Sequence, residues 1–274
     1  MSNSLLIDTY DIIHIRKQLR VYCGEPDALR SGLRQFGALI SGDMVYALAF
    51  HGSTRHRHVS NRSLTIYVPP GRAAWFLQFF RSEKYFRVCQ AVNDHGTGDI
   101  PYLEELDIHE HEYRLGERGL ATVTYLVDRR GRRVDVIEAD EGASSYPLAH
   151  ANTTIEQSFA TADSICIAHP KLMLTARAIG NLRTFPIGSA EPHQLWSLFV
   201  LRGFSMRFWR GERQSGPHGP EMTRMIEGRR SFFDAHCFVL RYDDGEDEAY
   251  YNAATWDWVN SITSPHRMDS GPSV

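Results

Sequence analysis

The chain has 274 residues, of which 42% are hydrophobic and 23% charged, and its formal net charge is -3. This composition is typical of a folded protein with a substantial core, and an aromatic content of 11% argues against disorder over most of the chain. A net charge this small indicates no bulk attraction to nucleic acid or to a membrane surface. The length allows one large domain or two small ones.

The cysteines indicate reduced core thiols. No two of them form a CxxC pair, so neither a zinc ribbon nor a small disulfide framework is expected. They are Cys23, Cys89, Cys166 and Cys237. The first residues carry no basic segment and only a short apolar run, which is not the pattern of a signal peptide. No apolar run approaches the ~20 residues needed to cross a bilayer, so we expect a soluble, cytoplasmic protein without a membrane partner, with the nucleus as an open alternative.

The first half of the chain alternates helical and strand patterns. Residues 5–23 fit either a helix or an extended segment. Pro26 opens a helix, because apolar residues recur at helical spacing after it and Gly37 suits the end. The expected elements are then a helix at 26–37, a buried strand at 38–41, a buried helix at 44–50, a polar basic loop at 51–61, a strand at 64–68 and a helix at 73–80.

The second half begins with a hairpin. Two strand-like runs flank Asp128 to Arg132, a glycine-containing connection that suits a tight turn. The expected elements are a loop at 93–99, strands at 120–127 and 133–139, a helix at 153–162, a short strand at 165–167, a helix or strand pair at 195–208, a loop at 210–220 and a core-facing segment at 232–242.

Three short segments carry the functional signal. The first strand ends in Ile40-Ser41-Gly42-Asp43, the second reads Ser63-Leu64-Thr65-Ile66-Tyr67-Val68, and a later strand reads Val134-Asp135-Val136-Ile137. Side chains at i and i+2 of a strand project from one face, so Ser63 and Thr65 share a face.

These segments resemble uncharacterised fungal proteins with a nucleotidyltransferase-like domain, of the DNA polymerase beta-like superfamily. There the segments read roughly Ile-Ser-Gly-Ser, Ser-Asp-Leu-Asp-Leu-Tyr-Val and Val-Asp-Leu-Ile. The resemblance implies an α/β (α+β) fold in which helices flank a mixed sheet, with an additional C-terminal helical or mixed region. It divides the chain into an N-terminal extension at 1–24, a nucleotidyltransferase-like domain at 25–205, a C-terminal region packed on it at 206–264 and a flexible tail at 265–274.

The departures from the family pattern point away from catalysis. Nucleotidyl transfer uses two divalent cations held by carboxylates, and Mg²⁺ prefers such charged oxygen ligands. Ser63 and Thr65 stand where the family has its two aspartates, and only Asp135 remains as a carboxylate. Asp43 replaces the phosphate-contacting serine, and its charge would repel a triphosphate. Gly42 keeps its place in the turn.

The leading interpretation is therefore a pseudoenzyme. It would be a binding or regulatory module without a cofactor, in which the former cleft takes a protein or a nucleotide-like ligand. That cleft would be lined by Gly42, Asp43, Ser63, Thr65 and Asp135.

Two alternatives stay open. One is an active nucleotidyltransferase that uses Mg²⁺ or Mn²⁺ with a nucleoside triphosphate at a relocated site, for example between Asp43 and Asp135. Glu138 cannot join Asp135 there without a bulge, because the two residues point to opposite faces of a strand. The other is a zinc-dependent hydrolase. Its ligands would come from the pairs His56 with His58 and His109 with His111, because i, i+2 histidines share a strand face.

Two basic clusters complete the candidates. Arg55, His56, Arg57, His58 and Arg62 lie between the first two motifs, and they could hold a phosphate or an acidic partner or could form a solvated loop. Arg129, Arg130, Arg132 and Arg133 lie at the expected hairpin tip, where exposed charge commonly serves solubility.

Overall fold

The protein is described by a computed structural model over residues 12–49, 63–92, 119–181, 191–201, 203–209, 230–232, 235–241 and 255–256. The helices are α1 (Ile12–Leu19), α2 (Pro26–Phe36), α3 (Asp43–Ala49), α4 (Ala73–Ser82), α5 (Tyr146–Ala149), α6 (Pro170–Leu174) and α7 (Glu191–Leu201). The strands are β1 (Leu39–Ser41), β2 (Ser63–Val68), β3 (Phe86–Val92), β4 (Leu120–Val127), β5 (Arg133–Ala139), β6 (Phe159–Ala160), β7 (Ser164–Ile167), β8 (Arg177–Asn181), β9 (Ser205–Trp209), β10 (Arg230–Ser231), β11 (Phe238–Arg241) and β12 (Thr255–Trp256).

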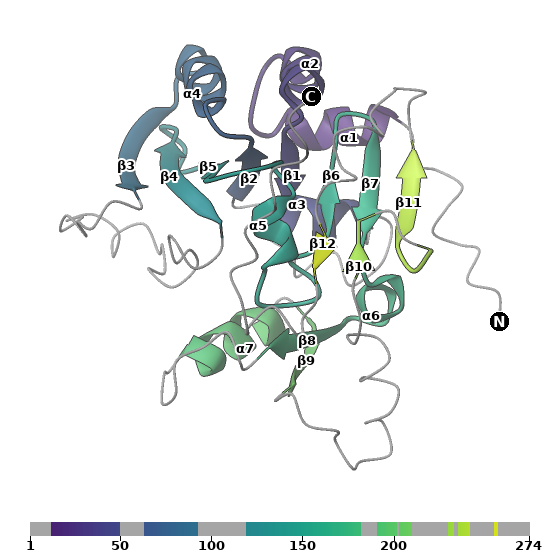
Figure 1. Cartoon of the computed structure of the whole chain (residues 1–274). Helices are drawn as coiled ribbons and strands as arrows, with labels where there is room; N and C mark the ends of the chain where they lie inside the picture. The colour runs from purple at the N-terminus through teal and green to yellow at the C-terminus, as the bar shows by residue number, and fades with distance from the viewer. Residues whose placement is uncertain are drawn as a thin grey trace, which may run out of the picture.

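An eight-stranded mixed sheet forms the centre of the fold, in the order β11-β7-β6-β1-β2-β5-β4-β3. Its strands pair antiparallel except for β2 and β5, which run parallel. The predicted α/β architecture with a mixed, helix-flanked sheet is confirmed (Figure 1). Two small sheets, β8 with β9 and β10 with β12, lie apart from it in the hydrogen-bonding pattern.

One face of the sheet packs against α1, α2 and α4. Strand alternation sends Leu64 and Ile66 of β2 to this face, and the parallel neighbour β5 adds Val134 and Val136. These side chains join the same core cluster as residues of the three helices, among them Ile15, Leu19, Leu29, Leu33, Phe76 and Phe80. In Figure 1, α2 and α4 lie near one another, and α7 with β8 and β9 lies at the opposite end of the molecule.

Helix α2 forms as its sequence predicts. Pro26 occupies its first turn, where the missing N–H costs nothing, and Leu29 and Leu33 are buried. Gly37 ends the helix in the left-handed region at φ 62°, a conformation that glycine adopts without strain. Most other expected elements of the described chain also form within a few residues of their predicted bounds, and residues 12–19 of the ambiguous segment are helical.

Two expectations about elements need correction. Residues 153–162 do not form a helix, because Thr153 bridges to Gly180 and Phe159–Ala160 form β6. The Glu156 carboxylate accepts hydrogen bonds from the N–H and hydroxyl of Thr153, at 3.0 and 2.9 Å, in the capping-box pattern that starts a helical turn. The turn does not continue, because Phe159 and Ala160 pair with β1 and β7 in the central sheet. Strand β3 was not expected from the sequence at all.

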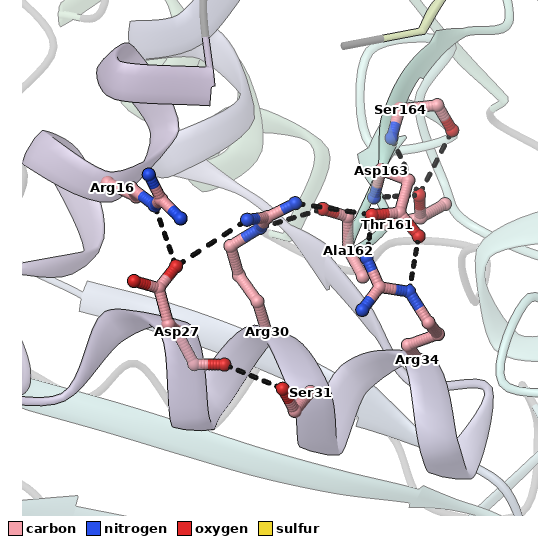
Figure 2. A network of polar contacts seen from close by, with 9 residues as sticks. All are labelled: Arg16, Asp27, Arg30, Ser31, Arg34, Thr161, Ala162, Asp163 and Ser164. Carbon is pink, nitrogen blue, oxygen red and sulfur yellow. Dashed lines mark hydrogen bonds and ion pairs between the residues drawn. The ribbon is translucent and has the colours of Figure 1, made fainter. Parts of the chain in front are cut away.

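A network of charged side chains fastens α2 to the turn between β6 and β7 (Figure 2). The Asp163 carboxylate accepts hydrogen bonds from Arg30 at 3.2 Å and from Arg34 at 2.8 Å. Arg30 also donates to the Ala162 carbonyl at 2.9 Å. The side chains of Asp163 and Arg30 are only 2% and 6% exposed, so the network is part of the interior.

Both ends of the described chain contribute to the main body of the fold. Ile15 and Leu19 of α1 belong to the larger core cluster. Strand β11 pairs with β7 and forms one edge of the central sheet. None of the helices in the described part of the chain is both long and apolar enough to cross a membrane.

Candidate functional site

The three motifs predicted from the sequence meet at one end of the central sheet. Ser41 of β1 pairs with Thr65 of β2, Thr65 pairs with Asp135 of β5, and Asp135 pairs with Tyr125 of β4. Directly paired residues point to the same face of a sheet, so these four side chains form one row across four strands. Ser63 lies two positions before Thr65 on the same face, beside Arg133.

Gly42 forms the turn between β1 and α3, next to this row of side chains. Its φ is +75°, in the left-handed region, and a Cβ atom at this position would lie 3.3 Å from the Thr65 hydroxyl oxygen. Glycine is therefore favoured here by both conformation and space. Its carbonyl accepts the N–H of Val45 at 3.0 Å, and α3 begins at the next residue, Asp43, which is buried.

The carboxylate of Asp135 is held by an arginine on its own strand. Arg133 Nε lies 2.8 Å from Oδ1 of Asp135, and Arg133 Nη2 lies 2.8 Å from Oδ2. The Asp135 side chain is fully buried and that of Arg133 is 15% exposed. The guanidinium also lies over the Tyr125 ring, with Cζ 5.8 Å from the ring centroid. A planar guanidinium that engages both carboxylate oxygens is the strongest geometry for such a pair.

The residues of this row do not fit the metal pair that the resemblance implies. Both oxygens of Asp135 face Arg133, and Ser63 and Thr65 supply only neutral hydroxyls. Hard divalent cations prefer charged oxygen ligands. This set of residues supplies a single carboxylate, that of Asp135, and Arg133 already neutralises its charge. Within the described ranges no three His, Cys, Asp or Glu side chains gather in a way that could hold a metal ion.

Glu138 is directed away from the row, as its spacing predicts. Its carboxylate accepts the Gly71 N–H and, at 3.3 Å, the Thr122 hydroxyl. Both contacts stabilise the turn before α4 and the pairing of β4 with β5, so Glu138 has a structural role.

Two buried tyrosines lie beside the same end of the sheet. The hydroxyls of Tyr22 and Tyr85 find no hydrogen-bond partner in the described part of the chain, although both residues are buried. Burial raises the pKa of the Tyr22 hydroxyl far above its usual range, and the charges of Asp43 and Asp135 raise it further. The sequence gave no sign of this influence of the two carboxylates on Tyr22.

Arg132 and Arg133 do not serve as solvated surface charge, and this corrects the expectation for the hairpin tip. Arg132 Nε donates to Asp128 at 2.7 Å, and its guanidinium also contacts the Val21 carbonyl and lies 5.9 Å from the centroid of the Tyr85 ring. Burial opposes ionisation of Asp128, but hydrogen bonds from Arg132 and Arg130 outweigh it and lower the pKa of the Asp128 carboxyl. One signal for Arg133 was present in the sequence, because Arg133 and Asp135 are spaced i, i+2 on a strand.

The other predicted site residues lie outside the described residues. These are the basic segment Arg55, His56, Arg57, His58 and Arg62, and the pair His109 and His111. The zinc alternative therefore stays a prediction.

Comparison with known proteins gives no identification. No family model, no curated protein and no solved structure matches the chain. The resemblance to nucleotidyltransferases accordingly rests on the sequence pattern alone: the three motifs, the aromatic helix after Pro70 and Arg202-Gly203-Phe204.

Proposed function

We propose that this protein is a catalytically inactive nucleotidyltransferase-like protein that works as a binding or regulatory module. The observation that carries the proposal is the buried Arg133–Asp135 pair. It ties up the only carboxylate that the family pattern leaves on this face.

The pair makes metal binding at Asp135 unfavourable for an energetic reason. A divalent cation would have to displace the guanidinium and leave it without its partner. Separating a buried ion pair in this way costs about 3–5 kcal/mol. Metal binding by the neutral hydroxyls of Ser63 and Thr65 would offset little of that cost.

Beside the buried row, Gly42 and Ser63 are half-buried, whereas Thr65 and Asp43 are buried. The surface that a ligand would contact is therefore the one formed by Gly42 and Ser63. The negative charge of Asp43 disfavours a triphosphate at the turn, where the family carries a serine. A ligand with less negative charge, or a segment of a partner protein, suits this surface better.

The first test is thermal denaturation with ATP, GTP, CTP and UTP, each with and without Mg²⁺ and Mn²⁺. A ligand that binds only the folded state raises the melting temperature. We expect no metal-dependent shift at millimolar ligand. A metal-dependent shift that disappears in Asp135→Ala would overturn the proposal in favour of an active enzyme.

A second test asks whether Arg133 is what blocks the metal. The double variant S63D/R133L would carry two carboxylates on one face with no guanidinium between them, and S63D alone is its matched control. We expect Mn²⁺ to raise the melting temperature of the double variant and not that of the control. Equal shifts in the native protein and in both variants would contradict the assigned role of Arg133.

A further inference from the structure

Three segments far apart in sequence converge on the Arg132 side chain. Arg132 belongs to the tip of the β4–β5 hairpin. Its guanidinium donates to the carbonyl of Val21, which lies just after α1, and it lies over the ring of Tyr85, which lies just after α4. Asp128 fixes the tip from within, because its carboxylate accepts the N–H groups of Arg130 and Arg132 at 2.9 and 2.8 Å. The tip is thus a rigid structure joined to two helix ends.

This convergence brings exposed cations together. Arg20 directly precedes Val21, Lys84 directly precedes Tyr85, and Arg129 and Arg130 lie at the tip itself. All four side chains are exposed, and none forms an ion pair in the described part of the chain. We call these four residues the tip patch.

The carboxylates near the tip patch, Glu83 and Glu25 outside the Asp128–Arg132 pair, offset only part of its charge. Asp128 is paired with Arg132, and Glu83 is half-buried and accepts the Gly24 N–H at 2.7 Å. Glu25 is exposed beside Gly24. The patch is therefore a local concentration of positive charge on a chain whose net charge is -3.

Lys84 lies in the C-terminal cap of α4. Its φ is 69°, in the left-handed region where helices commonly end, and the N–H groups of Lys84 and Tyr85 donate to the carbonyls of Arg81 and Phe80 at 3.1 and 2.9 Å. The cap holds Lys84 in place, and its exposed side chain forms no ion pair within the described residues.

We infer that the tip patch binds the phosphate backbone of a nucleic acid strand. Arginine guanidinium groups match phosphate oxygens in a fork geometry, and arginine and lysine together supply the charge that draws in a polyanion. A protein partner would call for a desolvated apolar or aromatic centre. Among the described residues, the exposed large apolar side chain next to the tip patch is Val21, with an exposure of 36%.

The binding is expected to be independent of base sequence. The patch presents long flexible cations on a hairpin tip, and phosphate contacts of this kind carry no sequence information. This inference does not depend on the proposed loss of catalysis, because no residue of the tip patch belongs to the row that contains Asp135.

The test is fluorescence anisotropy of a labelled single-stranded RNA with the full chain over a series of salt concentrations. At low salt, about 50 mM, we expect binding, with an affinity that falls steeply as salt rises. R129E/R130E should raise Kd about tenfold or more and reduce the salt slope by about 1 or more, because each lost phosphate contact on a single strand removes ~0.7. Asp128 accepts the backbone N–H groups of Arg130 and Arg132, which a side-chain substitution at 129 or 130 leaves in place, so the hairpin should survive the change.

The matched control is K171E/R207E, which reverses two exposed cations on α6 and β9, at the other end of the molecule from α2 and α4 in Figure 1. It changes net charge as much as R129E/R130E does, and we expect less than a twofold change in Kd. If R129E/R130E unfolds, a second patch variant, R20E/K84E, tests the same inference and should also raise Kd. Absence of RNA binding at low salt, or equal losses in patch and control variants, would overturn the inference. Equal competition by polyglutamate or by anionic lipid vesicles would assign the patch to another class of partner and overturn it too.

Discussion

The charged network that fastens α2 to the β6–β7 turn allows a sharp test of buried electrostatics in this fold. Asp163→Asn keeps the shape of the side chain and removes the charge that holds Arg30 and Arg34. Arg30 would stay 6% exposed with the largely exposed Asp27, 3.6 Å away, still beside it, while Arg34, 42% exposed, could turn to solvent. Leaving one buried charge uncompensated costs about 3 kcal/mol.

Asp27 offers a matched control in the same network. Its side chain is 59% exposed and pairs with Arg16 at 2.6 Å and with Arg30 at 3.6 Å (Figure 2). Exposed pairs contribute roughly 0–1 kcal/mol, so Asp27→Asn should change stability little.

Urea denaturation followed by circular dichroism would measure both variants. With a slope of about 3 kcal/mol per molar urea, D163N should lower the midpoint by about 1 M. A loss for D163N no greater than that for D27N would refute the reasoning, because it would mean that the interior position of Asp163 adds nothing to the pair.

Three further predictions concern other parts of the fold. Burial lowers the pKa of His150, although Asp140 partly opposes this, so its folded pKa lies below its unfolded one. Stability should therefore fall as pH drops below about 6.5 and the unfolded chain takes up the proton, and His150→Gln should flatten that dependence in pH-resolved denaturation. Gly32→Ala should destabilise by about 1–3 kcal/mol in urea melts, since its Cβ would lie 2.3 Å from the Trp75 ring and force α2 from α4. Tyr22→Phe removes a buried hydroxyl with no partner in the described chain, so thermal melting should show equal or higher stability, and a marked loss would reveal a hydrogen bond to buried water.

Local patterns predicted much of the fold correctly. The spacing of Leu29 and Leu33 together with Gly37 defined α2, and the turn residues 128–132 defined the β4–β5 hairpin. These features depend on residues close in sequence. The helix expected at 153–162 stops after the turn that Thr153 and Glu156 start, because Phe159 joins a strand that pairs with β1, far away in the chain, and with β7.

The candidate site was predictable in its position and not in its chemistry. Strand alternation placed Ser63 and Thr65 on one face, the family resemblance added Asp135, and the register of β2 and β5 agrees. The charges at the hairpin were interpreted as exposed, although Arg133 points along its strand to Asp135. The contribution of Tyr22 depends on how α1 packs against the sheet, which no local pattern encodes.

The order of strands in the central sheet has a consequence for how the chain folds as it is synthesised. Strand β7 consists of buried residues, and its outer neighbour β11 comes from a much later part of the chain. Until residues 238–241 emerge from the ribosome, the apolar edge of Ile165 and Ile167 has no strand to cover it. An unpaired edge of this kind is a template for association between chains. Truncations that end before β11 should therefore aggregate during expression even though the rest of the sheet is present.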